Sequence, residues 1–403
     1  MKTSHRIQLS AMMFAQYFVW GVWWVPFGAY LAKHGLDASI GTIFSTQGWA
    51  AIVAPLFVGA IADRHFSAQR VMAVLHLAGG ALLLALSLVG ADPAVMFVAA
   101  LGVMLCYMPT IALSNAVAFN VLDDTEKQFP AIRVWGTLGW ILGGLLVGRL
   151  LHAEQTATPI RIAAAASLAY GLYCFTLPDT PPRARGTKTN VLSLLGLDVI
   201  GAVRDRSFWI LIGCSLLLMI PLSFYYAYTN AFLVEVGVQS AAAVQTLGQV
   251  SEIGFLLLLP VFFRYLGIKW VLLIGMLAWA ARYVLFAHGY GPDGPVMPAL
   301  LIGLALHGVC FDFFFVAGQI YVDKRFPPET RGRAQSFLSL VTWGVGSVIG
   351  GVVANAVYVA NTHGGAHDWR YVWAAPAVLA LVVALIFALA FKDRRPVLKE
   401  NPA

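Results

Sequence analysis

Long apolar runs, separated by short polar or Gly/Pro-containing breaks, make up most of this chain of 403 residues. A helix of about 20 residues crosses a hydrocarbon core about 30 Å thick, and each run reaches that length. The apolar positions are continuous and do not alternate with polar ones, which favours membrane helices over barrel strands. The sequence predicts twelve spans, near residues 9–32, 41–62, 69–90, 94–121, 130–151, 159–178, 207–234, 241–265, 268–288, 296–322, 332–360 and 369–391.

The composition narrows the class of protein further. Hydrophobic residues make up 60% of the chain and charged residues only 11%. A soluble protein carries about 25% charged residues, because its surface faces water. We therefore exclude an ordinary soluble enzyme, a disordered scaffold and a coiled coil.

The lysines and arginines predict the orientation of the chain. If both termini are cytoplasmic, 20 of the 26 basic residues fall in cytoplasmic segments and four in outer loops, and Arg133 and Arg282 fall near or within spans. The positive-inside rule favours this arrangement. Because topology accounts for most of the net charge of +7, we expect no nucleic-acid partner.

A polar break at residues 179–206 divides the chain into two sets of six spans. The break begins Pro- and Arg-rich and then regains an apolar helical pattern, which predicts a cytoplasmic linker with a short surface helix. The halves share spacings, since Pro55 precedes Arg64 much as Pro260 precedes Arg264. Parallel six-helix repeats are typical of transporters whose substrate site lies at mid-membrane. The predicted domains are a first bundle at 1–178, the linker at 179–206, a second bundle at 207–391 and a cytoplasmic tail at 392–403.

Ionisable side chains within the spans need an explanation, because a charge at the membrane centre costs at least about 2.5 kcal/mol. Arg133 and Thr137 share one face of the fifth span, and Gln249 and Glu252 share one face of the eighth. A buried carboxylate that faces a buried arginine suits a proton carrier. The alternatives are an interfacial anchor for Arg133 and a structural ion pair for Glu252.

A second group of ionisable residues is less specific. Asp312 lies in the most aromatic run of the chain, in which His307 and Phe311 share a helix face. Proton binding and the tethering of neighbouring helices are equally open roles for Asp312. We interpret Arg282 and His76, on the ninth and third spans, as structural.

Polar and aromatic side chains also form stripes on two spans. Ser223, Tyr226 and Asn230 follow helical spacing on the seventh span, and Gln16 and Trp20 do so on the first. Aromatic faces beside amides and hydroxyls fit a polar, roughly planar, neutral ligand.

At these residues the sequence resembles the nucleoside:proton symporter family of the major facilitator superfamily. The resemblance covers essentially the whole chain and is carried by F-A-Q-Y-F-V-W-G (14–21), Y-M-P-T-I-A-L (107–113), F-P-A-I-R-V-W-G-T (129–137), L-L-G-L-D (194–198), Q-x-x-E (249–252) and F-D-F-F (311–314). It implies an all-α integral membrane protein with twelve transmembrane helices in two six-helix bundles. It also implies a monomer in the bacterial cytoplasmic (inner) membrane, driven by the proton gradient without a cofactor.

The resemblance implies roles for individual residues. Arg133, Thr137, Gln249 and Glu252 match positions that contact nucleoside, Phe311 a position that packs on the base, and Asp312 a position for proton coupling. The motif G-A-I-A-D-R (59–64) implies an intracellular gate at Asp63 and Arg64. Ser223, Tyr226 and His307 depart from the residues of the nucleoside permeases, which leaves the substrate open.

The sequence thus predicts a proton-coupled importer of nucleosides, or of a similar polar solute, that works by alternating access. The candidate substrate-binding residues are Gln16, Trp20, Arg133, Thr137, Ser223, Tyr226, Asn230, Gln249, Glu252, His307 and Phe311, with Glu252 and Asp312 as candidate proton carriers. The main alternative is a symporter or facilitator for a sugar-like metabolite. An intramembrane enzyme lacks support, because no H-E-x-x-H or G-x-S-x-G motif and no metal-ligand spacing occurs. A sensor would need an output domain, and only twelve residues follow Phe391.

Overall fold

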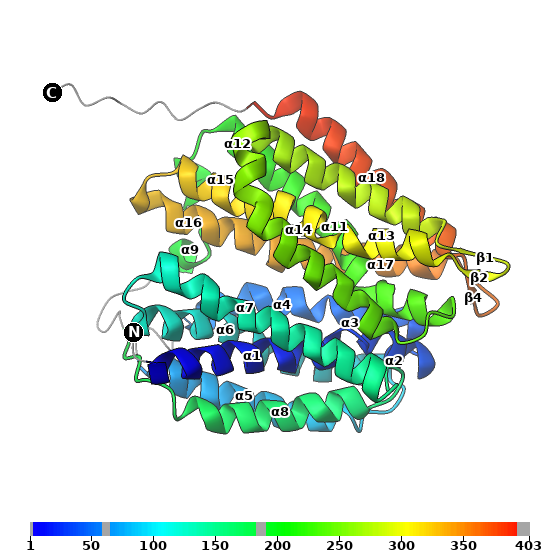
Figure 1. Cartoon of the computed structure of the whole chain (residues 1–403), viewed down its shortest axis with the longest axis horizontal. Helices are drawn as coiled ribbons and strands as arrows, with labels where there is room; N and C mark the ends of the chain where they lie inside the picture. The colour runs from blue at the N-terminus through cyan, green and yellow to red at the C-terminus, as the bar shows by residue number, and fades with distance from the viewer. Residues whose placement is uncertain (1–2, 59–64, 183–190, 393–403) are drawn as a thin grey trace.

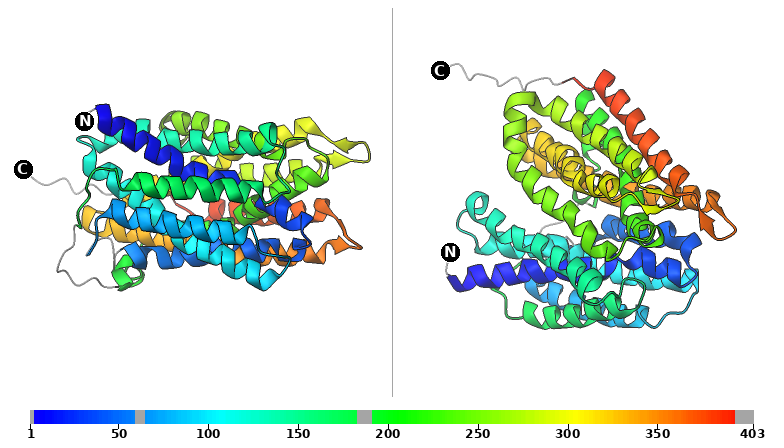
Figure 2. Two further views of the ribbon diagram at one scale, coloured as in Figure 1. Left: turned by 90° about the horizontal axis from the view of Figure 1, so that it is seen from below. Right: turned by 45° about the vertical axis from the view of Figure 1, so that its right-hand side comes forward.

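The computed structural model describes residues 3–58, 65–182 and 191–392, and it is helical almost throughout. Figure 1 shows two groups of helices side by side, one from the first half of the chain and one from the second. The first and last described residues and the linker helix α9 (Val191–Leu194) lie at one end of the molecule, which we call the linker end. Two short hairpins lie at the opposite end, which we call the hairpin end (Figures 1 and 2).

Ten helical elements are described in the first half. They are α1 (Thr3–Trp24), α2 (Phe27–Lys33), η1 (Asp37–Ser39), α3 (Ile40–Phe44), α4 (Thr46–Phe57), α5 (Ala68–Leu86), α6 (Pro93–Val121), α7 (Thr125–Leu145), η3 (Leu146–Leu150) and α8 (Thr158–Cys174). Within this half α1 packs on α7 and α8, and α5 packs on α6 and α8. The linker contributes two short helices, α9 (Val191–Leu194) and α10 (Val199–Ala202).

Ten further helical elements are described in the second half. They are α11 (Arg206–Glu235), α12 (Ala241–Ala287), α13 (Met297–Ala305), α14 (His307–Phe311), η4 (Asp312–Val316), α15 (Ala317–Arg325), α16 (Pro328–Ser339), η5 (Leu340–Gly346), α17 (Ser347–Ala360) and α18 (Trp369–Ala390). The hairpins pair β1 (Tyr290–Gly291) with β2 (Gly294–Pro295) and β3 (Thr362–His363) with β4 (Ala366–His367), both antiparallel.

Aspartates begin three of the long helices. The carboxylates of Asp92, Asp124 and Asp205 accept hydrogen bonds from the first-turn N–H groups of α6, α7 and α11, at 2.9, 3.1 and 2.9 Å. Such caps satisfy backbone donors that have no partner within the helix. The cap at Asp124 also starts α7 at Thr125, five residues before the predicted start of the fifth span at residue 130.

The predicted twelve crossings are accounted for in the described part of the chain. Nine helical stretches there are long and apolar enough to span a membrane. One of them, α12, is two helices joined at Gly267, whose φ of 75° lies in the left-handed region that glycine adopts without strain. The remaining two crossings are α1, with 22 residues, and α8, with 17. The chain is therefore a multi-pass membrane protein.

Candidate substrate cavity

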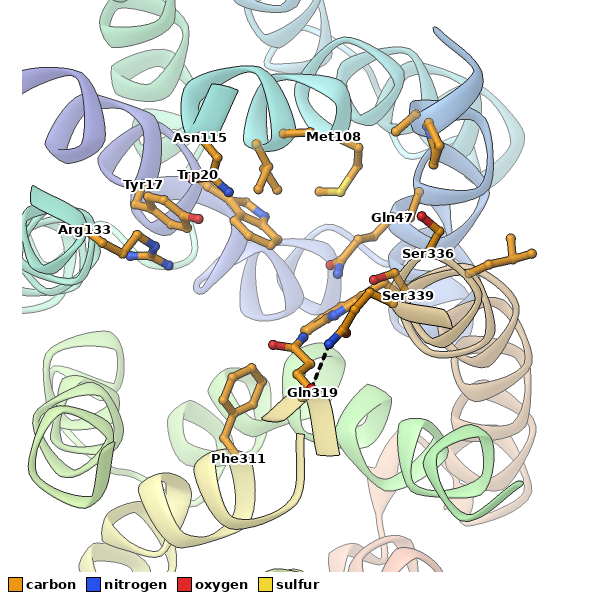
Figure 3. A pocket seen from close by; sticks show the side chains of 18 of the residues that line it. Tyr17, Trp20, Gln47, Met108, Asn115, Arg133, Phe311, Gln319, Ser336 and Ser339 are labelled. Atoms are coloured by element: carbon orange, nitrogen blue, oxygen red, sulfur yellow. Dashed lines mark hydrogen bonds between the residues drawn. The ribbon is translucent and has the colours of Figure 1, made fainter. Parts of the chain in front are cut away.

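A cavity of about 800 Å³ lies between the two halves. Its volume falls within the range of about 300–1,000 Å³ of small-molecule sites. Helices α1, α4, α6 and α7 line it from the first half, and α11, α12, α14, α15, α16 and η5 from the second. Its lining runs from Tyr226 and His307 to Leu194 on the linker helix α9, so the cavity reaches the linker end. Figure 3 shows side chains from both halves projecting into it.

Eight of the eleven residues predicted to bind substrate line this cavity. They are Trp20, Arg133, Thr137, Tyr226, Gln249, Glu252, His307 and Phe311. They come from α1 and α7 in the first half and from α11, α12 and α14 in the second. Helices far apart in the sequence therefore bring the predicted polar and aromatic groups to one enclosed space.

Arg133 is held in the cavity wall by an aromatic ring of its own half. Its guanidinium carbon lies 4.0 Å from the ring centroid of Tyr17, a cation–π contact. Because α7 begins at Thr125, Arg133 stands two turns into the helix, whereas the sequence prediction put it three residues from the helix start. Figure 3 shows Arg133 and Tyr17 on one side of the cavity and Phe311 on another.

Glu252 faces a histidine of the same half. The Oε2 atom of Glu252 lies 3.8 Å from Nε2 of His307, and the Glu252 side chain is 27% exposed whereas that of His307 is 3% exposed. This distance is too long for a hydrogen bond and allows an ion pair when the imidazole carries a proton. Glu252 therefore has one side open to the cavity and one side against His307.

His307 belongs to a stack of rings that ends at a buried arginine. Its ring centroid lies 5.0 Å from that of Tyr225 and 5.8 Å from that of Phe311. The guanidinium of Arg282 lies 4.2 Å from the Tyr225 ring, and its Nε donates to the carbonyl of Gly303 at 3.0 Å. Arg282 is fully buried and packs on the Tyr225 end of this stack, away from Phe311. These contacts are those of a structural residue, which is the role expected for Arg282.

Asp312 stands apart from the cavity lining. It is fully buried at the first position of η4, a π-helical segment. Among the described residues, neither carboxylate oxygen has a hydrogen-bond partner. Buried polar groups are normally paired, and π segments within helices are frequent at functional sites. The structure thus keeps both proposed roles of Asp312 open.

Three predicted substrate-binding residues lie outside the cavity. Gln16 is buried within the first half, where its amide donates to the Thr110 hydroxyl at 2.7 Å and contacts His76 at 3.1 Å. Ser223 donates to the Met219 carbonyl one turn earlier on α11. For these residues the helix face predicted for the cavity is the face that packs on a neighbouring helix.

Asn230 is the third predicted substrate-binding residue outside the cavity. The Asn230 amide donates to the Gln245 side chain at 2.8 Å, away from the main cavity. Asp63 and Arg64 lie outside the described residues.

The sequence prediction missed several cavity residues. They are Tyr17, Gln47, Asn115, Trp140, Gln319 and Trp343. In the described part of the chain, the indole N–H of Trp20 and the amide oxygen of Asn115 have no hydrogen-bond partner. The lining thus offers donors and acceptors that a polar ligand can satisfy.

A direct contact between the halves closes the hairpin end. We call it the seam, made of Gly28, Ala38, Gly41, Ala227, Tyr228 and Asn355. The Gly41 N–H donates to the Tyr228 hydroxyl at 3.1 Å and to the Asn355 amide oxygen at 3.0 Å, and the Asn355 amide donates to the Ala38 carbonyl at 2.9 Å. The cavity therefore reaches one end of the molecule while the other end is sealed.

His367, on the loop hairpin β3–β4, sits beside the seam. Its Nδ1 lies 2.7 Å from Glu235, and its Nε2 lies 2.7 Å from the Tyr358 hydroxyl and 3.9 Å from Asp37 of the first half. The hydrogen bond to Glu235 raises the pKa of His367 above 6.5, and the charges of Glu235 and Asp37 raise it further. His363, Asp368 and Arg370 lie in the same shallow surface site.

A protonated His367 therefore links the two halves, and we expect the seam to loosen as the pH on the hairpin side rises. A raised pKa means that the stabilisation is complete below 6.5 and is lost as the pH rises through the raised value. The readout is maleimide labelling of Ser45→Cys, a buried position beside the seam that packs against Gly351 of the other half. Dividing the labelling rate by that of the same protein with His367→Gln cancels the pH dependence of the thiol. A ratio that does not change with pH contradicts this prediction.

Comparisons with known proteins agree with this geometry. The family model described as "Nucleoside H+ symporter" matches residues 1–395. YegT of Escherichia coli (strain K12) is 41% identical, covering 98% of this chain and 95% of YegT, and the xanthosine permease of the same organism is 33% identical, covering 96% of each. The crystal structure of the nucleoside transporter NupG (D323A mutant) superposes with a TM-score of 0.89 at 32% identity, covering 96% of this chain and 100% of that chain.

Proposed function

Because the chain belongs to the nucleoside H+ symporter family, we propose that it imports nucleosides together with protons through the central cavity. The observation that carries this proposal is that Arg133, Thr137, Gln249, Glu252 and Phe311 all line one cavity between the halves. A ligand that contacts both halves at once can stabilise one arrangement of the halves relative to the other, which alternating access requires. The protein is a transporter, and its fold is that of the major facilitator superfamily.

The chemistry of the lining fits a nucleoside. Phe311 and Trp343, whose ring centroids lie 6.2 Å apart, provide apolar faces for a base. The Arg133 guanidinium donates hydrogen bonds and the Glu252 carboxylate accepts them, which matches the hydroxyls of a ribose. We assign to Glu252, or to the buried Asp312, the binding and release of the coupled proton.

The orientation follows from the charges in the sequence. With both termini on the cytoplasmic side of the inner membrane, the linker end faces the cytoplasm and the hairpin end faces outward. The conformation described above is then inward-facing, with the seam as the outer barrier. Each chain carries a complete cavity between its own halves, which supports a monomer as the working unit.

The sugar-like alternative has weaker support. It was motivated by Ser223, Tyr226 and His307, which depart from the residues of the nucleoside permeases. Tyr226 and His307 line the cavity, but the Ser223 hydroxyl is hydrogen-bonded to its own helix. Competition by monosaccharides against a labelled nucleoside separates the two substrate classes.

The test is uptake of labelled uridine and adenosine into proteoliposomes. We expect an inward proton gradient to drive accumulation above equilibrium, and Arg133→Ala to abolish it. Arg161→Ala, an exposed arginine of the first half on α8, is the matched control and should transport normally. If folded protein takes up neither nucleoside, the nucleoside assignment is overturned. Sugars would then be tested as substrates.

A further inference from the structure

We propose that Gln47, on α4, is a specificity-determining residue that binds the base of the transported nucleoside. The inference rests on the function proposed above and adds a contact from the half of the chain opposite Glu252. Gln47 is only 5% exposed, and it lines the cavity. Figure 3 shows its side chain projecting from α4 into the cavity, near Ser336 and Ser339 of the other half.

The side-chain amide of Gln47 is free to hydrogen-bond to a ligand. Among the described residues it makes no hydrogen bond, whereas the cavity residue Gln335 donates its amide to the Gln319 carbonyl at 2.7 Å. Polar groups in protected places are normally paired, so an amide held at the cavity wall needs a partner that enters the cavity. Apolar residues of α6, Met108, Ile111 and Ala112, share this wall and offer no competing partner.

The internal repeat of the chain relates Gln47 to a residue of the second half. Gln47 stands eight residues before Pro55 within α4, and Glu252 stands eight residues before Pro260 within α12. The two residues are therefore equivalent positions of the two halves, and both line the cavity. The first half presents a neutral amide where the second presents a carboxylate.

The same relation links the two helices that carry the other polar lining residues. Arg133, Thr137 and Trp140 on α7 have the spacing of Ser336, Leu340 and Trp343 on α16 and η5, and all six line the cavity. At two of these pairs of equivalent positions one residue is charged and the other neutral, Arg133 with Ser336 and Glu252 with Gln47. A ligand in the cavity can therefore contact a charged set of groups, Arg133 and Glu252, and a neutral set, Ser336 and Gln47.

The two sets suit different parts of a nucleoside. An amide carries a donor and an acceptor side by side, and it pairs with a base edge on which an N–H or NH₂ group adjoins a carbonyl or ring nitrogen. The charged set suits the ribose hydroxyls, which both donate and accept. Gln47 is therefore assigned to the base edge.

The experiment compares nucleosides that differ at one edge only. Uptake KM is measured for uridine, 3-methyluridine, which lacks the base N–H, and 2′-deoxyuridine, which lacks a ribose hydroxyl. In Gln47→Met, which keeps the length of the side chain, we expect the KM for uridine to rise about 3- to 10-fold, as for the loss of one hydrogen bond. The preference for uridine over 3-methyluridine should disappear, and the preference over 2′-deoxyuridine should remain.

Two further variants complete the design. Gln239→Met, on the exposed turn between α11 and α12, is the matched control and should transport as the wild type does. Gln47→Asn keeps the amide but shortens the side chain, so it should lose part of the preference for uridine over 3-methyluridine. It provides the same test if Gln47→Met fails to fold.

The possible failures can be told apart. If the wild type transports uridine and both Gln47 variants keep its KM and its base preference, the inference is overturned and the proposed function stands. Loss of the 2′-deoxyuridine preference with the base preference intact overturns the assignment to the base. If the wild type takes up no nucleoside, the proposed function fails, and this inference fails with it.

Discussion

Glu252→Gln abolishes the accumulation of nucleoside above equilibrium while the exchange of nucleoside down its gradient continues. Glutamine has nearly the shape of glutamate and still hydrogen-bonds to a ligand, but it cannot bind and release a proton. The carboxylate of Glu252 is open to the cavity on one side and lies 3.8 Å from His307 on the other. A proton taken up there changes the charge at the ligand itself, which couples the two cargoes.

Two assays on the same proteoliposomes separate coupling from binding. Gradient-driven accumulation should fall to the equilibrium level, and counterflow with nucleoside on both sides should persist. Asp293→Asn, an exposed acidic residue beside the hairpin β1–β2, controls for the removal of one carboxylate. Full uphill uptake by Glu252→Gln would refute the assignment of the coupled proton to Glu252. If uphill uptake were then lost in Asp312→Asn, the coupled proton would be assigned to Asp312 instead.

Gly28→Val abolishes uptake by preventing the closure of the hairpin end. Gly28 lies on α2, and a Cβ atom there would overlap the backbone carbonyl oxygen of Ala227 on α11. Because this neighbour is backbone, no side chain can rotate away, and the two halves have to separate. We expect the variant to remain open at the hairpin end, with transport reduced to background.

Labelling at the seam measures this effect directly. Ser45 is only 2% exposed. Ser45→Cys should therefore react faster with a membrane-impermeant maleimide when Gly28→Val is present. The four native cysteines, Cys106, Cys174, Cys214 and Cys310, are first replaced so that only the engineered thiol reacts. Gly213→Val, at an exposed helix position with open space around it, should leave both labelling and uptake unchanged. Normal uptake by Gly28→Val would show that the contact is dispensable.

Much of the fold could be predicted because the membrane imposes continuous apolar runs of a fixed length. The all-helical major facilitator fold and the family resemblance are confirmed by the comparisons. Helix ends were harder, because they depend on single caps. The Asp124 cap starts α7 five residues before Pro130, so this proline lies inside the helix and removes one backbone hydrogen bond there.

The cavity could be predicted only in part. Charged residues such as Arg133 and Glu252 stand out in a span, since their cost demands a function or a partner. Helical spacing gives the face of Gln16 or Ser223 but not the helix that this face meets, and both pack within their own half. Gln47 carries no charge and directly follows two small hydroxyl residues, Ser45 and Thr46, so only its equivalence to Glu252 in the repeat distinguishes it.

The glycine-lined seam also bears on how tightly the protein couples its two cargoes. Side chains change rotamer within picoseconds to nanoseconds, whereas whole bundles move within microseconds to milliseconds. A barrier of side chains would open on the faster scale and leak protons between turnovers. Gly28 and Gly41 both stand directly against backbone carbonyl oxygens of the other half, so we expect the seam to open only when the bundles move. Each opening is then a full step of the transport cycle, and little of the proton gradient is dissipated without cargo.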